Sequence, residues 1–308
     1  MEAFDTGLGI DAGGTQTRWA LADVAGTIVA EGHVAGASAL QMASPEGRVR
    51  LRATFEALAR DVLAHGRPRR IHAGLTGFGG DSLLLGEWLA ELLAVAPQDI
   101  SLCNDIEIAY LDAFEPGAGY LVYAGTGSIA AFIDKEGTFH RAGGRGVVLD
   151  DAGGGFWIAR EAMRRIWRRE DEQPGAWQAS PLARAVFEHV GGSDWSFSRQ
   201  FIYTRERGEI GQLALAVARS ADADGEARDI LQQAGRELAR LAQALVVRFG
   251  PRPIVLSGRA AELHPLIALA MREALRQAPG GMPVFEQRTA RPHAAAARLA
   301  IRPNPTTP

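Results

Sequence analysis

The fold is decided by one short stretch near the start of the chain, LGIDAGGTQTR at residues 8–18. An apolar run ends at the carboxylate of Asp11, a Gly-Gly-Thr turn follows, and a second apolar run leads away. Glycines permit such a turn, and exposed backbone N–H groups together with a hydroxyl can hold phosphate oxygens. Asp11 stands where a phosphate-bound Mg²⁺ would take an oxygen ligand. Taken alone, the stretch fits a plain β-hairpin equally well.

The same pattern occurs a second time, and the repeat favours the phosphate interpretation. Asp23 stands eight residues after Thr15, and Asp134 stands eight residues after Thr126. Each aspartate is followed by a Gly-Thr pair, and each threonine follows a glycine turn that closes an apolar run. We therefore expect two related halves, each with a hairpin that grips phosphate, and a nucleotide in the cleft between them.

Length and composition exclude several classes of function. The 308 residues can bury a sizeable core, and two domains are the natural expectation. The formal net charge of −3 gives no basic bias toward nucleic acid or an anionic membrane. Lys135 is the only lysine, which excludes a Walker A loop and the protein-kinase arrangement.

Cysteine usage and hydropathy bear on the compartment. Cys103 is the only cysteine, so no intrachain disulfide can form, which fits a reducing cytoplasm. No apolar run approaches the length of a membrane span, and the first residues lack a basic segment followed by an apolar one. We therefore expect neither a membrane span nor an export signal.

Periodicity and turn residues predict an α/β chain with a junction near residues 115–119. For the first half we expect strands at 7–12, 17–23 and 27–34, a helix after Ser44, a strand at 71–75, a helix at 81–95, a strand at 100–103 and a helix at 106–114. For the second half we expect strands at 120–124, 128–134 and 138–142, a helix at 156–168, helices at 209–220 and 224–249, a strand at 253–258, a helix at 264–277, a strand at 283–286 and a helix at 291–301. Residues 170–208 are polar and helical in patches, without a motif.

A few polar residues could carry chemistry. Asp105 ends a strand beside the expected cleft, where its carboxylate could accept the proton of an attacking hydroxyl, or it could cap the helix that follows. Asp150 and Asp151 lie in a glycine-rich loop, where they could bind sugar hydroxyls, approach Mg²⁺ or remain solvated. Arg145 in the same loop could meet a phosphate or pair with these aspartates. Gly258 would let the backbone approach an adenosine, or it could simply form a tight strand-to-helix turn.

The order and spacing of four motifs resemble the N-acetylglucosamine kinase group, of the BadF/BadG/BcrA/BcrD-type ATPase family in the actin, sugar-kinase and heat-shock ATPase superfamily. The motifs are GIDAGGT at 9–15, Asn104-Asp105, AGTGS at 124–128 and GGRG at 143–146 with Asp151 after it. The resemblance extends from about residue 7 to residue 300. It implies two ribonuclease-H-like domains, 1–116 completed by a helix at 290–302, and 117–289, with ATP and Mg²⁺ in the cleft between them.

The resemblance also implies roles for individual residues. Asp105 would be the base for the sugar 6-hydroxyl, and Asp11 would hold Mg²⁺ through water. ATP contacts are implied for Asp11, Gly13, Gly14, Thr15, Gln16, Gly125, Thr126, Gly127, Gly211, Gly258 and Glu262. Sugar contacts are implied for Asn104, Ser128, Gly144, Arg145, Gly146 and Asp151.

Three departures from the group's pattern concern the sugar side. The group usually shows Gly-Gly-Trp-Gly, but the third position here is Arg145. It usually shows Gly-Asp-Glu-Gly-Ser, but residues 150–154 read DDAGG. An asparagine expected near residues 39–40 is replaced by Ala-Leu, with Gln41 adjacent. The phosphate chemistry is therefore better supported than the identity of the sugar.

The function we expect is ATP-dependent phosphorylation of an amino sugar at its 6-hydroxyl, with N-acetylglucosamine first and glucosamine as the alternative. We expect a cytoplasmic homodimer with small-molecule substrates and no nucleic-acid or membrane partner. A less favoured alternative is an ATPase that activates a radical dehydratase or reductase, because such relatives bind a cluster through several cysteines and this chain has only Cys103. A sugar-sensing regulator would need a DNA-binding segment, for which residues 1–6 leave no room.

Overall fold

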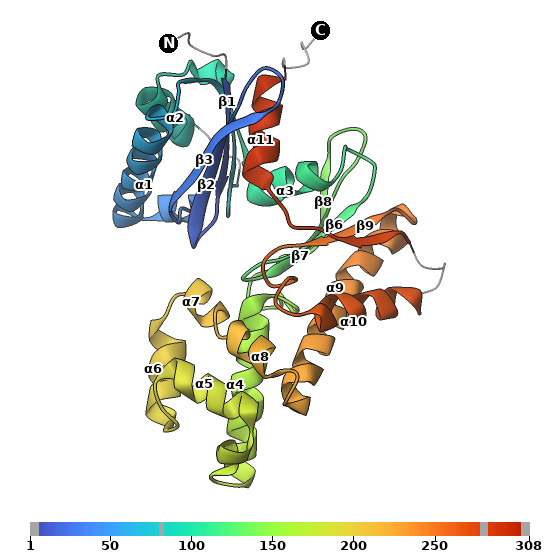
Figure 1. The fold of residues 1–308 in the computed structure, drawn as a ribbon. Helices are drawn as coiled ribbons and strands as arrows, with labels where there is room; N and C mark the ends of the chain where they lie inside the picture. Colours follow the sequence, from blue (N-terminus) through green and yellow to red (C-terminus); the bar gives the residue numbers. More distant parts are fainter. Residues whose placement is uncertain (1–5, 80–82, 278–282, 303–308) are drawn as a thin grey trace. The chain divides into compact units, whose positions relative to one another are not determined.

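A computed structural model describes residues 6–79, 83–277 and 283–302 (Figure 1). The chain divides into two compact units, residues 1–115 with 290–308, and residues 116–289. Each unit contains one five-stranded mixed sheet. Within the described residues, no helix combines the length and the apolar character needed to cross a membrane.

In the first unit, three antiparallel strands are followed by two strands parallel to the first, in the order β3-β2-β1-β4-β5. The strands are β1 (Thr6–Ala12), β2 (Gln16–Ala22), β3 (Ile28–Ala35), β4 (Pro68–Leu75) and β5 (Ile100–Asn104). The helices are η1 (Ala39–Ala43), α1 (Pro45–Leu63), α2 (Leu83–Leu93), η2 (Pro97–Asp99), α3 (Asp105–Ala113) and α11 (Pro292–Ile301). The expected order of elements for this half is confirmed, although residues 81–82 of the helix expected at 81–95 lie outside the described residues.

Helices cover both faces of this sheet (Figure 1). The apolar faces of α1 and α2 share one core with β1 and β4, including Leu8, Phe55 and Leu89. On the other face, α11 presses directly on β1, since a Cβ on Gly9 would come within 2.0 Å of the carbonyl oxygen of His293. The last helix of the chain is therefore an integral part of the first unit.

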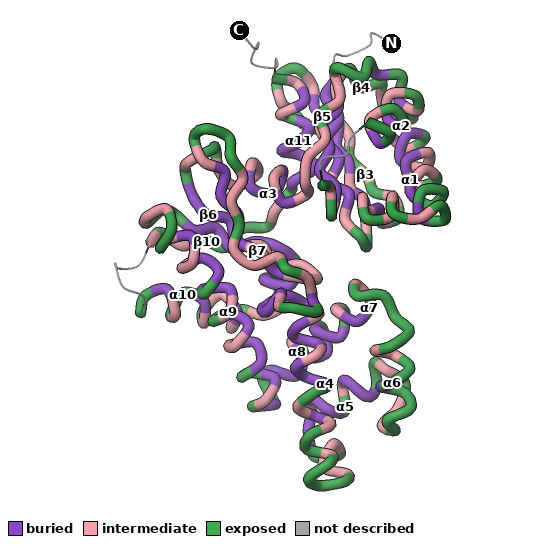
Figure 2. The backbone as a smooth tube through the Cα atoms, turned by 180° about the vertical axis from the view of Figure 1, so that it is seen from behind, coloured by how far each residue is buried: buried purple, intermediate pink, exposed green. Residues whose placement is uncertain are grey.

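The sheet of the second unit has the order β8-β7-β6-β9-β10. Counted within each unit, this is the same order as in the first sheet: third, second, first, fourth and fifth strand. The strands are β6 (Tyr120–Ala124), β7 (Ser128–Ile133), β8 (Phe139–Gly143), β9 (Ile254–Ser257) and β10 (Phe285–Gln287). The helices are α4 (Gly155–Glu172), η3 (Ala176–Ala179), α5 (Pro181–Val190), α6 (Trp195–Thr204), α7 (Arg207–Gly211), α8 (Ala214–Ser220), α9 (Gly225–Phe249) and α10 (Pro265–Arg276). The central strands β6 and β9 are buried along almost their whole length (Figure 2).

The Asp-x-x-Gly-Thr repeat forms the same turn in both units. The Oδ1 atom of Asp23 accepts hydrogen bonds from the N–H groups of Ala25 and Thr27, both at 2.9 Å. Asp134 repeats this bonding with the residues two and four positions later, at 3.1 and 2.8 Å. Gly26 and Gly137, the fourth residue of each turn, have φ of 81° and 83°. The prediction of two related halves is thus confirmed down to the turn between the second and third strands of each sheet.

Two parts of the second unit differ from what the sequence predicts. The single helix expected at 209–220 is two short helices, α7 and α8, separated at residues 212–213. Residues 170–208 fold into the end of α4, three further helical segments and the start of α7, held partly by aromatic contacts. The ring of Trp167 lies 5.5 Å from that of Phe187 and 5.3 Å from that of Trp195. Contacts between distant aromatic residues therefore order a segment whose local sequence carries no motif.

Candidate functional site

The first unit gathers several predicted site residues at one edge of its sheet. The parallel strands β1, β4 and β5 end in register, with Ala12 beside Leu75 and Leu75 beside Asn104. The residues that follow these strands therefore start from the same edge, which is where α/β proteins place ligand sites.

The first hairpin turn contains four residues, 13–16, between the paired residues Ala12 and Thr17. The N–H of Gly13 donates to the carbonyl of Gln16 at 3.1 Å, and the carbonyl of Gly13 accepts from Ala37 at 3.0 Å. Gly14 and Thr15 form an exposed tip. The tip therefore offers its backbone and the Thr15 side chain to solvent or to a ligand.

The structure shows that the cap of α3 is Asn104, so the interpretation of Asp105 as the cap is wrong. The Asn104 side chain accepts from the N–H of Ile106 at 3.2 Å, and the Glu107 side chain accepts from the N–H of Asn104 at 3.0 Å. The other end of the Asn104 amide donates to the carbonyl of Phe78 at 3.3 Å. Asp105 is the first residue of the helix.

The carboxylate of Asp105 is half-buried and accepts a hydrogen bond from the hydroxyl of Thr76, with 2.5 Å between the oxygens. Burial raises the pKa of Asp105 above its ordinary value, and the hydrogen bond from Thr76 opposes this only in part. Sequence reasoning missed Thr76. A usable signal was present, since Thr76 directly follows a strand, as Asp105 does.

Asp224 shows how a purely structural carboxylate in this chain differs. Burial would raise its pKa, but donors from Leu182, Ser180, Ala227 and Glu226 outweigh burial and lower it. A raised pKa, as at Asp105, suits a group that must accept a proton.

The second hairpin turn contains three residues, 125–127, and is held by the start of α4. The N–H groups of Gly155 and Phe156 donate to the carbonyls of Gly125 and Thr126 at 2.9 and 3.0 Å. Gly154 packs on the backbone of Gly127, since a Cβ at Gly154 would come within 2.6 Å of it. This turn is therefore fixed to the N-terminal end of a long helix, whose dipole favours negative charge nearby.

The other residues of the second unit expected to contact ATP lie close to this turn. Gly258, with φ of 101°, packs on the last residue of β6, because a Cβ there would come within 2.4 Å of the Ala124 carbonyl oxygen. A Cβ on Gly211 would lie 3.7 Å from the side chain of Thr126. Glu262 is exposed in the turn that follows Gly258. Three segments far apart in the sequence thus meet around residues 124–126.

The glycine-rich loop contacts the second turn through Asp151. This residue is buried and has a positive φ of 55°. Its Oδ1 accepts from the N–H of Gly146 at 3.0 Å, and its Oδ2 lies under Gly127, where a Cβ would approach within 2.3 Å. Burial raises the pKa of Asp151, while the hydrogen bond from Gly146 opposes the rise. The residues expected to face sugar therefore adjoin those expected to face phosphate.

Neighbouring loop residues have structural partners of their own. Asp150 pairs with Arg240 at 3.1 Å, so its cation is Arg240 and not Arg145. The buried hydroxyl of Ser128 donates to the carbonyl of Ala152 at 2.7 Å and ties the loop to β7. Gly144 and Gly146 have φ of 61° and 88°, a region that favours glycine.

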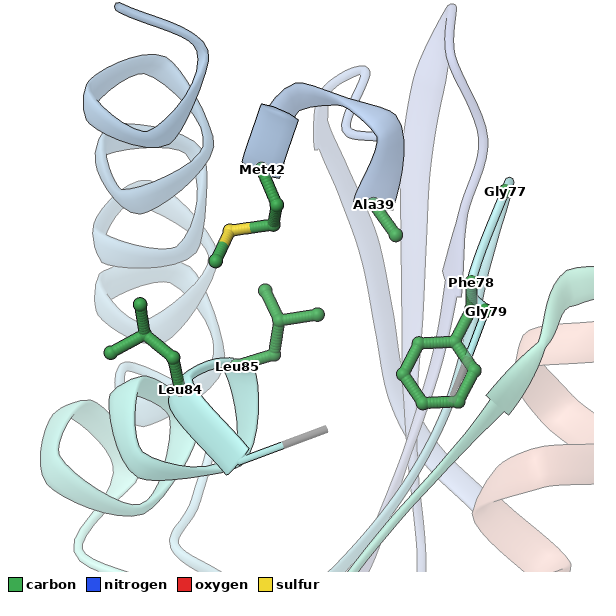
Figure 3. Close-up of a pocket in the computed structure, with 7 residues that line it drawn as sticks. All are labelled: Ala39, Met42, Gly77, Phe78, Gly79, Leu84 and Leu85. Carbon is green, nitrogen blue, oxygen red and sulfur yellow. The ribbon is translucent and has the colours of Figure 1, made fainter. Parts of the chain in front are cut away.

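An apolar cavity lies in the first unit beside the loop that follows Thr76 (Figure 3). Its volume is about 150 Å³, and it is lined by Ala39, Met42, Gly77, Phe78, Gly79, Leu84 and Leu85. Gln41, next to the position where an asparagine was expected, is occupied in capping η1, because its Oε1 accepts from the N–H of Ser38 at 2.9 Å.

The carboxylates present fit Mg²⁺ held by a nucleotide. In the part of the chain that the structure describes, no group of three or more His, Cys, Asp or Glu side chains is arranged to hold a metal. Mg²⁺ in nucleotide sites keeps several waters and needs only one or two carboxylates besides the phosphates. Asp11, half-buried and two residues before Gly13, is a carboxylate of this kind.

Comparison with known proteins gives a family match along most of the chain. A profile of the BadF/BadG/BcrA/BcrD ATPase family matches residues 8–296. Among curated proteins, the chain is 28% identical over 176 residues to an N-acetyl-D-glucosamine kinase of Dictyostelium discoideum, covering 54% of this chain and 55% of the relative. It is 30% identical over 151 residues to an N-acetylmuramic acid/N-acetylglucosamine kinase of Clostridium acetobutylicum, covering 48% of each chain. The matches thus span about half the length of these curated relatives.

Solved structures match over nearly the full length. A protein of Chromobacterium violaceum, provisionally named an N-acetylglucosamine kinase, superposes with a TM-score of 0.74 at 25% identity. The match covers 97% of this chain and all of that one. The two-domain α/β fold expected from the sequence is therefore confirmed.

Proposed function

Because the chain belongs to the BadF/BadG/BcrA/BcrD ATPase family, we propose that it is a sugar kinase that transfers the γ-phosphate of ATP to the 6-hydroxyl of N-acetylglucosamine. The observation that carries the proposal is the environment of Asp105, a half-buried carboxylate with a raised pKa. It follows β5 at the same edge of the sheet at which β1 leads into the first hairpin turn. The names of the curated relatives and of the superposed structure support an amino sugar as the acceptor.

In this proposal the two units divide the work. In the first unit, Gly13, Gly14, Thr15 and Gln16 contact phosphate, and Asp11 holds Mg²⁺ through its water shell. In the second unit, Gly125, Thr126 and Gly127 contact phosphate, while Gly211, Gly258 and Glu262 contact the rest of ATP. Mg²⁺ would neutralise charge on the phosphates during transfer.

The sugar would lie against Asp105, Asn104 and the glycine-rich loop. Asp105 accepts the proton of the attacking hydroxyl, and its raised pKa makes it a stronger base than an exposed aspartate. Gly144, Arg145, Gly146 and Asp151 contact the sugar hydroxyls, and Ser128 supports them by holding the loop at Ala152.

The apolar cavity next to Phe78 favours N-acetylglucosamine over glucosamine. Among the described residues, the side chains that line it carry no polar group to pair with a charged amine, which would lose hydration there, whereas a methyl group would gain from burial. Asn104 links this cavity to the proposed base, because its amide bonds the Phe78 carbonyl.

The radical-enzyme activator is a poor alternative. An iron–sulfur cluster held by four cysteines and shared by two subunits would need two cysteines from each, and this chain has only Cys103.

The test is a coupled assay of ADP release with glucose, glucosamine, N-acetylglucosamine and N-acetylmannosamine. We expect the highest kcat/KM with N-acetylglucosamine, and we expect phosphorus–proton correlation NMR of the product to place phosphate on O6. ADP release that no sugar stimulates would refute the proposal, and a phosphate at another position would refute its regiochemistry.

Two further points belong to the same proposal. We propose that the enzyme is a homodimer that works in the cytoplasm, the latter resting on its single cysteine. Analytical ultracentrifugation and cell fractionation test the two points separately. A monomer at micromolar concentration, or recovery outside the cytoplasmic fraction, would contradict them.

A further inference from the structure

Thr76 occupies a junction between three segments of the first unit. Its N–H donates to the carbonyl of Ala12, the last residue of β1, at 2.9 Å. Its carbonyl accepts from the Ser38 hydroxyl at 3.0 Å and from the Ala39 N–H at 2.9 Å. Three hydrogen bonds to other segments therefore fix the backbone of this residue.

The side chain of Thr76 reaches a fourth segment. Its hydroxyl donates to Oδ2 of Asp105, and in the opposite direction the Asn104 amide donates to the Phe78 carbonyl. Close packing fixes the spacing between these segments, since a Cβ on Gly74 would come within 3.0 Å of the Cα of Asp105. The loop after β4 and the start of α3 are therefore cross-linked by two side chains.

We propose that Thr76 is a positioning residue for phosphoryl transfer: its hydroxyl holds one oxygen of Asp105, so that the other faces the acceptor hydroxyl. The inference rests on the proposed role of Asp105 as base. The backbone of Thr76 is fixed, so its hydroxyl holds the Asp105 carboxylate in one rotamer. Without this hydrogen bond the carboxylate would rotate. A base must lie within hydrogen-bond reach of the proton it removes, so loss of this orientation lowers the turnover number.

The same hydrogen bond sets the pH range in which Asp105 can act. Burial raises the pKa of Asp105, and the Thr76 hydroxyl, by donating to the ionised form, lowers it. Removing the hydroxyl must therefore raise the pKa further. Because the base acts only when ionised, the acid limb of the activity profile must move to higher pH.

The experiment compares Thr76→Val, which removes the hydroxyl and keeps the shape, with Thr76→Ser, which keeps the hydroxyl. The control is Thr54→Val, which removes an exposed hydroxyl that bonds only the Arg50 carbonyl within α1. For Thr76→Val we expect kcat at neutral pH to fall by about tenfold, the size of one hydrogen bond, with KM for ATP nearly unchanged. The acid limb of kcat should move to higher pH, whereas Thr76→Ser and Thr54→Val should resemble the wild type.

Three results would overturn the proposal. The first is wild-type kcat and an unmoved acid limb in Thr76→Val. The second is a Thr76→Ser enzyme as impaired as Thr76→Val, which would assign the effect to the lost methyl packing. The third is an equal loss of ATP affinity and kcat. Should Thr76→Val fold poorly, Thr76→Ser and Thr76→Ala differ only by the hydroxyl and give the same answer.

A carbon-13 NMR titration of the Asp105 carboxyl separates this inference from the proposed function. We expect its pKa to be higher in Thr76→Val than in the wild type, whatever sugar the enzyme accepts. An unchanged pKa would overturn the positioning role even in an active sugar kinase. Conversely, wild-type turnover in Asp105→Asn would overturn the assignment of the base, whatever pKa shift Thr76→Val causes at Asp105.

Discussion

Residues 13–16 and residues 125–127 are the tips of two hairpins that occupy the same place in two sheets of the same strand order. The first tip is exposed at Gly14 and Thr15 and is fixed through Gly13 and the backbone near Ala37. The second is half-buried, because the first N–H groups of α4 donate into it. The same sequence pattern therefore forms an exposed turn in the first unit and a half-buried turn held by α4 in the second unit.

The fifth strand of each sheet extends this contrast. In the first unit β5 leads into Asp105, whereas in the second unit β10 leads into Arg288. The duplication thus repeats the turns that would hold phosphate, while only the first copy has an acidic residue directly after its fifth strand. We infer that binding is shared between the units and that proton transfer belongs to the first.

The largest expected effect follows from this division. Asp105→Asn should lower kcat roughly 10²- to 10⁴-fold, the usual contribution of a general base, with ATP affinity kept. Arg288→Gln, at the corresponding place in the second sheet, should leave kcat near the wild-type value. Steady-state kinetics with calorimetric ATP titration measures both, and comparable losses in the two variants would break the contrast.

The same Asp105→Asn variant should not be less stable than the wild type. The raised pKa of Asp105 means that the folded state holds its carboxylate less favourably than the unfolded state does at neutral pH. That cost is absent below the ordinary pKa and appears as pH rises, so the amide removes it. Urea unfolding at pH 7 checks this point, and a clearly less stable variant would assign Asp105 a structural role.

The next effect compares the two tips directly. A Cβ on Gly127 would come within 2.3 Å of Asp151 Oδ2, whereas a Cβ on Gly14 meets no atom within 4 Å. Gly127→Ala should therefore lower the free energy of unfolding by about 1–3 kcal/mol, while Gly14→Ala should stay within about 0.5 kcal/mol of wild type. Equal losses in urea unfolding would show that the second tip is no more tightly held than the first.

The smallest expected effect concerns the Asp-x-x-Gly-Thr turn, which has the same structure in both units. Gly26→Ala and Gly137→Ala each place a side chain at a positive φ, 81° and 83°, with no close neighbour. Each should cost about 1–2 kcal/mol, and the two losses should agree within a few tenths. A loss several times larger at one position would mean that the turns are equivalent only in sequence.

Local patterns in the sequence predict the features that depend on nearby residues. The order of strands and helices, the repeated Asp-x-x-Gly-Thr turn and the start of a helix after Ser44 follow from side chains a few positions apart. The cap of α3 was misassigned by one residue, because Asn104 and Asp105 are both good caps and only Asn104 has Glu107 three positions later.

Features set by distant residues could not be predicted in the same way. The hydrogen bond between Thr76 and Asp105 depends on the parallel pairing of β4 with β5. Likewise, Gly211 approaches Thr126 and the start of α4, which lie far from it in the sequence. The sequence could therefore name candidate site residues but could not predict the contacts between them.

The most direct test of the account is calorimetric titration of the wild type, Thr15→Ala and Thr126→Ala with a non-hydrolysable ATP analogue and Mg²⁺. If both turns contact phosphate, each substitution removes a hydrogen bond to a charged group and should raise Kd about tenfold or more. Wild-type affinity in either variant would show that one turn does not contact the nucleotide. It would contradict the phosphate contacts from both turns on which the proposed function rests.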